Sequence, residues 1–163
     1  MKCLVFSDTH GDFTYARAAM ALHRDCEVVF FLGDGLRDIE QLASIYPTVA
    51  FIAVRGNCDF NDDFCGAECK KVESITLLGK RIVLTHGDLY SAKSGDERLL
   101  YLARERGADI LLYGHTHTPR QEYLSELEMY LFNPGAASGY SPTYGIILLE
   151  EGRYPLLSHG SFR

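Results

Sequence analysis

The chain has 163 residues, of which 47% are hydrophobic and 23% charged, and its formal net charge at pH 7 is -6. This composition is typical of a single globular domain spanning residues 1–163 and excludes a chain too polar to bury a core. The negative charge argues against an extended nucleic-acid surface, which would need Lys and Arg to neutralise phosphates, and no apolar run reaches the ~20 residues of a membrane span.

The first third of the chain alternates between strand-like and helix-like stretches. Apolar runs of strand length occur at Lys2–Phe6, Glu27–Leu32 and Ala50–Val54. Asp12 is suited to the N-cap of a helix that runs to about His23. A second helix is expected from Leu36 to Tyr46, because Pro47 disfavours helical geometry in the residue before it. This alternation predicts an α/β architecture.

Beyond Asn57 the pattern becomes mostly strand. Val72–Leu78 and Arg81–Leu84 are expected to pair as antiparallel strands across a turn at Gly79–Lys80. A third helix is expected over about Gly95–Arg106. Further strands are expected at Ile110–Tyr113, Gln121–Leu124, Met129–Phe132, Thr143–Leu149 and Arg153–Leu157. Two sheets packed face to face with helices outside would accommodate all of these elements, with His159 in a short tail that follows them.

A polar cluster follows each of five predicted strands. The clusters are Ser7–Asp12, Gly33–Gly35, Gly56–Asp59, Thr85–Asp88 and Gly114–His117. Ligands of α/β sheets lie at the carboxyl ends of strands, so these five loops can converge although they are far apart in the chain. Four of the six histidines lie in the clusters, which indicates a metal site.

The clusters supply nitrogen and oxygen donors that suit Mn, Fe, Ni or Zn. The candidate ligands are Asp8, His10, Asp34, Asn57, His86, His115 and His117. Seven ligands are too many for one tetrahedral ion. If Asp34 bridges, two cations can each have four protein ligands and lie ~3.5 to 4 Å apart, a spacing at which they activate a water between them.

The order aspartate-x-histidine, glycine-aspartate, glycine-asparagine, histidine and glycine-histidine-x-histidine resembles the calcineurin-like metallophosphoesterases, especially their small bacterial and archaeal phosphodiesterases. The resemblance covers nearly the whole chain. It implies an αββα sandwich of two mixed sheets flanked by helices. It also implies a dinuclear phosphoesterase, most of all a phosphodiesterase, in which a metal-bridging hydroxide attacks phosphorus and manganese is the first metal to test.

Carried onto this sequence, the resemblance divides the ligands between two metals. One metal is expected at Asp8, His10, Asp34 and His117. The other is expected at Asp34, Asn57, His86 and His115. Asp34, Asn57 and His86 are accordingly the residues we expect to act in catalysis.

Two further residues are candidates for substrate contact. Many relatives of this kind have a histidine after glycine-asparagine, where this chain has Cys58, so the group that protonates the leaving oxygen is not identified by the motif. Arg55 can reach a phosphate through its guanidinium, although an ion-paired arginine is an equally good interpretation. Asp12, Asp59 and Asp88 are expected to cap a helix or hold turns.

Two other functions fit parts of the pattern. A non-catalytic metal-binding scaffold subunit could share the fold without turnover. An amidohydrolase barrel also uses a histidine-x-histidine motif, but such barrels need ~250 residues. The expected substrate is a small phosphoester, and a homo-oligomer is compatible with the sequence. Five cysteines without regular even spacing indicate a reducing compartment, so we expect a cytoplasmic protein.

Overall fold

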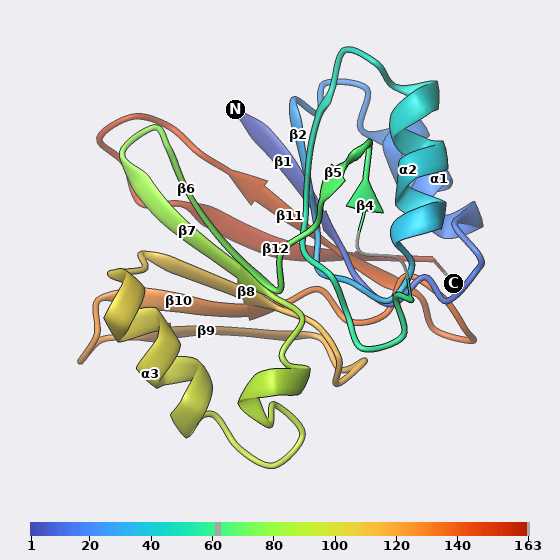
Figure 1. The fold of residues 1–163 in the computed structure, drawn as a ribbon. Coiled ribbons are helices and arrows are strands. Elements are labelled where there is room, and N and C mark those ends of the chain that lie inside the picture. The colour runs from blue at the N-terminus through green and yellow to red at the C-terminus, as the bar shows by residue number, and fades with distance from the viewer. Residues whose placement is uncertain (61–62, 163) are drawn as a thin grey trace.

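The fold consists of two packed sheets with helices on their outer faces (Figure 1). The computed structural model describes residues 1–60 and 63–162, and these form two five-stranded mixed sheets, a two-stranded sheet and three α-helices. This confirms the predicted αββα sandwich. No helix among the described residues is long and apolar enough to cross a membrane.

The first sheet has the strand order β12-β11-β1-β2-β3. In this order the strands span Leu156–Ser161, Thr143–Leu148, Lys2–Phe6, Val28–Phe31 and Ala50–Ala53. β1, β2 and β3 are parallel neighbours, and β11 pairs antiparallel with both β1 and β12. The carboxyl ends of β1, β2 and β3 therefore lie at one edge of the sandwich.

The second sheet has the strand order β6-β7-β8-β10-β9. In this order the strands span Val72–Leu77, Lys80–Thr85, Ile110–Tyr113, Met129–Asn133 and Arg120–Leu124. β7, β8 and β10 are parallel, while β6 and β9 pair antiparallel at the two edges. A short hairpin of β4 (Asp63–Phe64) and β5 (Ala67–Glu68) precedes this sheet, and the sequence did not predict it.

The alternation of side chains along β1 shows how the layers are held together. Cys3 and Val5 face the core between the two sheets, whereas Leu4 and Phe6 face the helices. Both faces of the strand are thus buried from Cys3 to Phe6, which explains the unbroken apolar run over these four residues. The sheets approach closely at Gly145, where an added Cβ would lie 2.4 Å from the ring of Phe132 in the opposite sheet.

Each helix buries an apolar stripe against one sheet. α1 (Thr14–Leu22) and α2 (Leu36–Ile45) pack on the outer face of the first sheet, and α3 (Glu97–Arg106) packs on the second. α2 ends before Pro47, as predicted. The N-cap of α1 is Phe13 rather than Asp12, although the Asp12 carboxylate still accepts a hydrogen bond from the Thr14 N–H at 2.9 Å.

Two sequence-based boundaries were wrong. The turn between β6 and β7 is formed by Leu78 and Gly79, whose φ angles of 47° and 76° suit a tight hairpin, one residue earlier than expected. The last strand begins at Leu156 and includes His159, which was expected in a tail. The ring of His159 stacks on Phe132, and its Nε2 lies 2.7 Å from the Asn133 carbonyl, so tertiary contacts order a polar segment.

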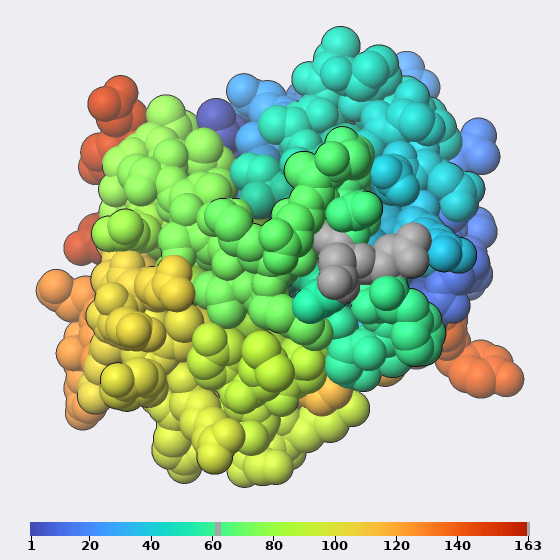
Figure 2. Space-filling view, in the orientation of Figure 1, coloured from blue at the N-terminus to red at the C-terminus, as the bar shows by residue number. Residues whose placement is uncertain are grey.

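Residues 63–71, which lead into β6, form a segment that lies across one face of the molecule (Figure 2). Figure 2 shows this segment between the surface of α2 and that of β6 and β7. The Cys65 N–H donates to the Glu40 carboxylate at 3.0 Å, which ties the β4–β5 hairpin to α2. The hairpin is therefore held against α2.

Candidate metal centre

Five loops bring the predicted ligands together. Three loops follow the parallel strands β1, β2 and β3 of the first sheet, and two follow β7 and β8 of the second. The carboxyl ends of parallel strands lie at the same edge of a sheet, so side chains from the loops of both sheets meet there. The seven candidate ligands all lie in this group of loops.

His86 is the centre of one cluster of donor atoms. Its Nδ1 lies 2.7 Å from the Leu32 carbonyl, so Nδ1 carries the proton and Nε2 presents its lone pair to the site. Around Nε2 lie Asn57 Oδ1 at 3.1 Å, His115 Nδ1 at 3.2 Å and Asp34 Oδ2 at 3.3 Å. A divalent cation would bind lone pairs that converge in this way, and the donor types suit a transition metal.

The second cluster lies around Asp8. His117 Nε2 is 3.1 Å from Asp8 Oδ1 and 3.2 Å from His10 Nε2, while His10 Nε2 is 3.7 Å from Asp8 Oδ1. One atom from each of the three side chains can therefore bind one cation. The other carboxylate oxygen of Asp8 accepts hydrogen bonds from Ser7 Oγ and from the His115 N–H, which orients the carboxylate.

Asp34 lies between the two clusters. It offers one ligand atom to a group with Asp8 and His86, and one to a group with His10 and Cys58, with all donor atoms of each group within 4.8 Å of one another. The Oδ1 atom of Asp34 also accepts a hydrogen bond from the Cys58 N–H at 2.7 Å. This position is the one that a bridging carboxylate requires.

The pKa shifts at the clusters follow from burial and from the charges of neighbouring side chains. Burial opposes ionisation of Asp34, but its contacts with His86 and the Cys58 N–H outweigh burial and hold its pKa well below the ordinary value of 3.8. Burial also works to lower the pKa of His86, yet Asp34 and Asp8 raise it above its ordinary value. Burial, together with the charge of His86, lowers the pKa of His115 and favours the neutral ring that can bind a metal.

Five of the seven candidate ligands have left-handed backbone conformations. Their φ angles are 57° at Asp8, 50° at His10, 60° at Asp34, 65° at His115 and 59° at His117. Non-glycine residues rarely adopt such angles, because Cβ approaches the neighbouring carbonyl. Strained backbone of this kind concentrates at functional sites, where the surrounding structure holds it in place.

Asp59 joins two of these loops, a role that the sequence did not reveal. Its Oδ2 accepts from the N–H groups of Asp34 at 2.8 Å and Gly56 at 2.9 Å. Its Oδ1 accepts from Gly35 at 2.8 Å and Leu36 at 2.9 Å, so it also caps α2 from outside the helix. The carboxylate thus fixes the loop of Asp34 against the loop of Asn57.

Other neighbours hold the loops at short distance. A Cβ added to Gly56 would lie 2.0 Å from Asp34 Oδ1, and one added to Gly114 would lie 2.0 Å from Ser7 Oγ, so only glycine fits at either position. Asn133, at the end of β10, donates from Nδ2 to the Gly114 carbonyl at 3.0 Å. Asn133 therefore braces the loop of His115 and His117 without itself being a predicted ligand.

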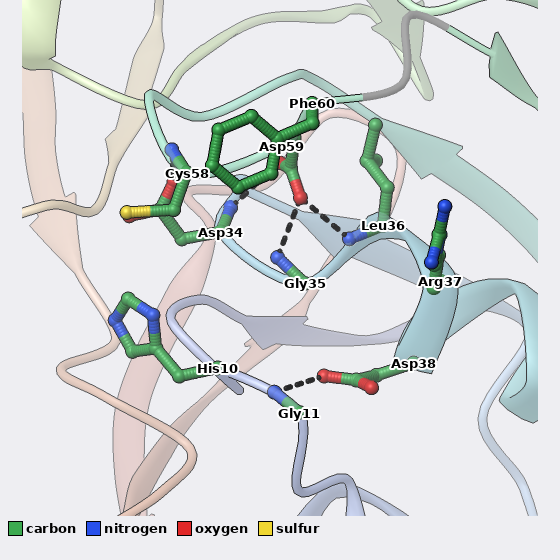
Figure 3. A pocket seen from close by; sticks show the side chains of 10 residues that line it. All are labelled: His10, Gly11, Asp34, Gly35, Leu36, Arg37, Asp38, Cys58, Asp59 and Phe60. Atoms are coloured by element: carbon green, nitrogen blue, oxygen red, sulfur yellow. Dashed lines mark hydrogen bonds between the residues drawn. The ribbon is translucent and has the colours of Figure 1, made fainter.

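A pocket of about 350 Å³ opens beside the clusters (Figure 3). His10, Asp34 and Cys58 lie on one side of it. Arg55 is not among the residues that line it. Arg55 instead lies near the thiol of Cys69: burial raises the pKa of this thiol, and the positive charge of Arg55 acts in the opposite direction. Of the two residues predicted to contact substrate, Cys58 is the one that reaches the pocket.

Comparison with known proteins gives a consistent result. A family model described as the calcineurin-like phosphoesterase superfamily domain matches residues 1–152. The probable metallophosphoesterase YsnB of Bacillus subtilis strain 168 is 30% identical over 156 residues, covering 93% of this chain and 86% of YsnB. The phosphodiesterase YfcE of Escherichia coli strain K12 is 30% identical over 171 residues, covering 90% of this chain and 87% of YfcE.

A solved structure with a different name shares the fold. Vacuolar protein sorting 29 from Cryptosporidium parvum superimposes with a TM-score of 0.78, and the match covers 99% of this chain and 97% of that one. The sequence identity is 20%, so this likeness concerns the arrangement of helices and strands alone.

Proposed function

The chain belongs to the calcineurin-like phosphoesterase superfamily, and we propose that it hydrolyses small phosphodiesters with two divalent cations held by the seven candidate ligands. The observation that carries this proposal is the position of Asp34, which offers a ligand atom to each of two donor groups. One cation is assigned to Asp8, His10, Asp34 and His117. The other is assigned to Asp34, Asn57, His86 and His115.

When bound, the two cations would lower the pKa of water and offset negative charge on the phosphoryl oxygens. The protein's own contribution is to hold the ligands in place before substrate arrives. The Leu32 carbonyl fixes the tautomer of His86, and Ser7 orients the carboxylate of Asp8. In the reaction one water gives up a proton as its oxygen bonds to phosphorus, the bond from phosphorus to one alcohol oxygen breaks, and that alcohol oxygen takes up a proton.

The preference for diesters over monoesters is part of the proposal. It is supported by the name of the relative YfcE, a phosphodiesterase of which this chain covers most. Manganese is the first metal to test, followed by nickel, iron and zinc, because the set mixes imidazole, carboxylate and amide donors. A cytoplasmic location and a small-molecule substrate complete the proposal.

Asp34→Asn tests the assignment directly. We expect this variant to lose the manganese-dependent hydrolysis of bis-p-nitrophenyl phosphate by at least about a hundredfold, because an amide is a weaker bridging ligand. Asp12→Asn is the matched control, since Asp12 is an exposed carboxylate of the first motif, and the side-chain oxygen of asparagine can still accept the hydrogen bond from the Thr14 N–H. Unchanged turnover in Asp34→Asn, with normal metal content, would refute the bridging role.

A non-catalytic scaffold is the second candidate. The observation in its favour is the likeness to vacuolar protein sorting 29, a protein whose name refers to sorting rather than to hydrolysis. Under this reading the protein binds two cations per chain but releases no nitrophenol from either bis-p-nitrophenyl phosphate or p-nitrophenyl phosphate. Turnover of either ester after metal addition would reject the scaffold reading.

A further inference from the structure

The pocket beside the metal centre extends well past the predicted ligands. Figure 3 shows His10 and Cys58 on one side, Arg37 on the opposite side and Phe60 between them. A group bound across this pocket would therefore begin next to the ligands and end at the guanidinium of Arg37. Phe60 is aromatic and Arg37 is positively charged, so they can recognise different parts of one molecule.

Phe60 provides an aromatic surface at the pocket. Its side chain is 95% exposed, although apolar side chains of this size are usually buried. Leu36, which also lines the pocket, is buried and adds an apolar side chain to the lining. An exposed ring above an apolar wall suits a flat aromatic group that stacks on the ring.

Arg37 provides a positive charge that is not paired with the carboxylates of Asp38 or Asp59, because these bind other groups. Asp38 accepts from Thr9 Oγ1 at 2.6 Å and from the Gly11 N–H at 2.8 Å. Asp59 is engaged by the four backbone N–H groups described above. Of the three carboxylates that line the pocket, Asp38 and Asp59 are thus bound to the protein's own N–H and O–H donors, and Asp34 is a candidate metal ligand. The exposed Arg37 is left to attract an anion.

We propose that this pocket binds the nucleoside part of a phosphodiester that carries a second phosphate. The base stacks on Phe60, the second phosphate pairs with Arg37, and the scissile phosphate lies at His10 and Asp34. The inference deepens the proposed function, because the metal centre supplies the site for the first phosphate. It assigns the substrate to the nucleotides and makes Arg37 and Phe60 specificity-determining residues.

The test is calorimetric binding to the manganese-loaded protein. The probes are adenosine 3′,5′-bisphosphate, which has both phosphates, and adenosine 5′-monophosphate, which has one. We expect the bisphosphate to bind about tenfold more tightly, as one charge-assisted contact provides. Arg37→Gln should abolish this difference, and Phe60→Ala should weaken both probes about tenfold. Both side chains are exposed, so neither variant should disturb folding.

Matched controls lie on α3, which packs on the other sheet. Arg98→Gln and Tyr101→Ala remove an exposed arginine and a 71% exposed aromatic ring, and both should leave the binding of the two probes unchanged. Equal binding of the two probes to the unmodified protein, or no effect of Arg37→Gln and Phe60→Ala, would overturn the inference.

Hydrolysis of bis-p-nitrophenyl phosphate by the same samples separates the two proposals. Turnover without the expected nucleotide binding overturns the pocket assignment and leaves the phosphoesterase proposal intact. Nucleotide binding that depends on Arg37 and Phe60, without turnover of any ester, supports the pocket and overturns the phosphoesterase proposal.

Discussion

At the scale of single residues, the proposed metal centre depends on side chains that are not themselves candidate ligands. Asp59 is the main example, because its carboxylate accepts hydrogen bonds from two loops that carry Asp34 and Asn57. Partners of this kind usually alter metal affinity about 10- to 100-fold when they are changed. Asp59 is therefore a positioning residue for Asp34, the carboxylate that we propose to bridge the two cations.

We predict that Asp59→Asn weakens manganese binding about 10- to 100-fold and lowers the free energy of unfolding by roughly 1–3 kcal/mol. The amide nitrogen of asparagine would face a backbone N–H group where a carboxylate oxygen now accepts. Metal titration by calorimetry and urea unfolding measure the two effects. Asp25→Asn, which changes an exposed carboxylate paired with Lys2, is the control. Manganese affinity equal to that of the unmodified protein would contradict the positioning role.

The left-handed backbone at the ligands has a measurable cost. At His117, with φ of 59°, alanine should be less stable than glycine by about 1 kcal/mol in the metal-free protein, because only glycine avoids the Cβ clash. Urea unfolding of His117→Ala and His117→Gly in the presence of chelator measures the difference. The same pair of substitutions at Arg98, inside α3, should give the opposite order. A more stable alanine variant at position 117 would show that the strain is absent.

The sequence identified the ligand candidates because they are chemically conspicuous. Histidines and aspartates directly after strands form a recognisable pattern, and the structure brings all seven side chains together. It did not reveal the role of Asp59, because nothing in the sequence shows that this carboxylate accepts hydrogen bonds from the distant N–H groups of Asp34 and Leu36. That information lies in the tertiary structure alone.

At the scale of secondary structure elements, α1 is tied to the first sheet at its C-terminal end. His23 Nε2 lies 3.0 Å from the hydroxyl of Tyr144 on β11, and the two rings meet edge to face. Burial, with a contribution from the charge of Lys2, lowers the pKa of His23 below its ordinary value of 6.5. The neutral imidazole is therefore the form that the folded state prefers.

This pKa shift makes stability depend on pH. The unfolded chain binds a proton at His23 at higher pH than the folded protein does, so folding is disfavoured as the pH falls below 6.5 toward the lower folded pKa. We predict that His23→Gln loses less stability than the unmodified protein between about pH 7.5 and about pH 5. Urea unfolding of both proteins across this range provides the comparison. Parallel stability curves would contradict the assignment.

The accuracy of the predicted elements followed the strength of their sequence patterns. Apolar β1 was predicted with its observed bounds. The polar segment Ser158–Ser161 was missed as a strand, because its pairing with β11 and the stacking of His159 on Phe132 outweigh its weak strand propensity. The two-residue strands β4 and β5 are too short to carry a periodic pattern.

At the scale of the whole molecule, the sandwich places two independent sets of strand ends at one edge. β1, β2 and β3 contribute Asp8, Asp34 and Asn57 from the first sheet, while the loops after β7 and β8 contribute His86 and His115 from the second. Neither sheet alone holds a complete set of ligands for the cation assigned to His86. The packing of the two sheets is therefore a condition for the dinuclear site that we propose.

The most direct test of the dinuclear proposal is a manganese titration of the chelator-stripped protein, followed by hydrolysis of bis-p-nitrophenyl phosphate. If two cations act together, we expect little activity below one equivalent of manganese per chain and a plateau at about two equivalents. A plateau at about one equivalent would contradict the dinuclear centre, and the absence of activity at saturating metal would contradict the proposed phosphoesterase function.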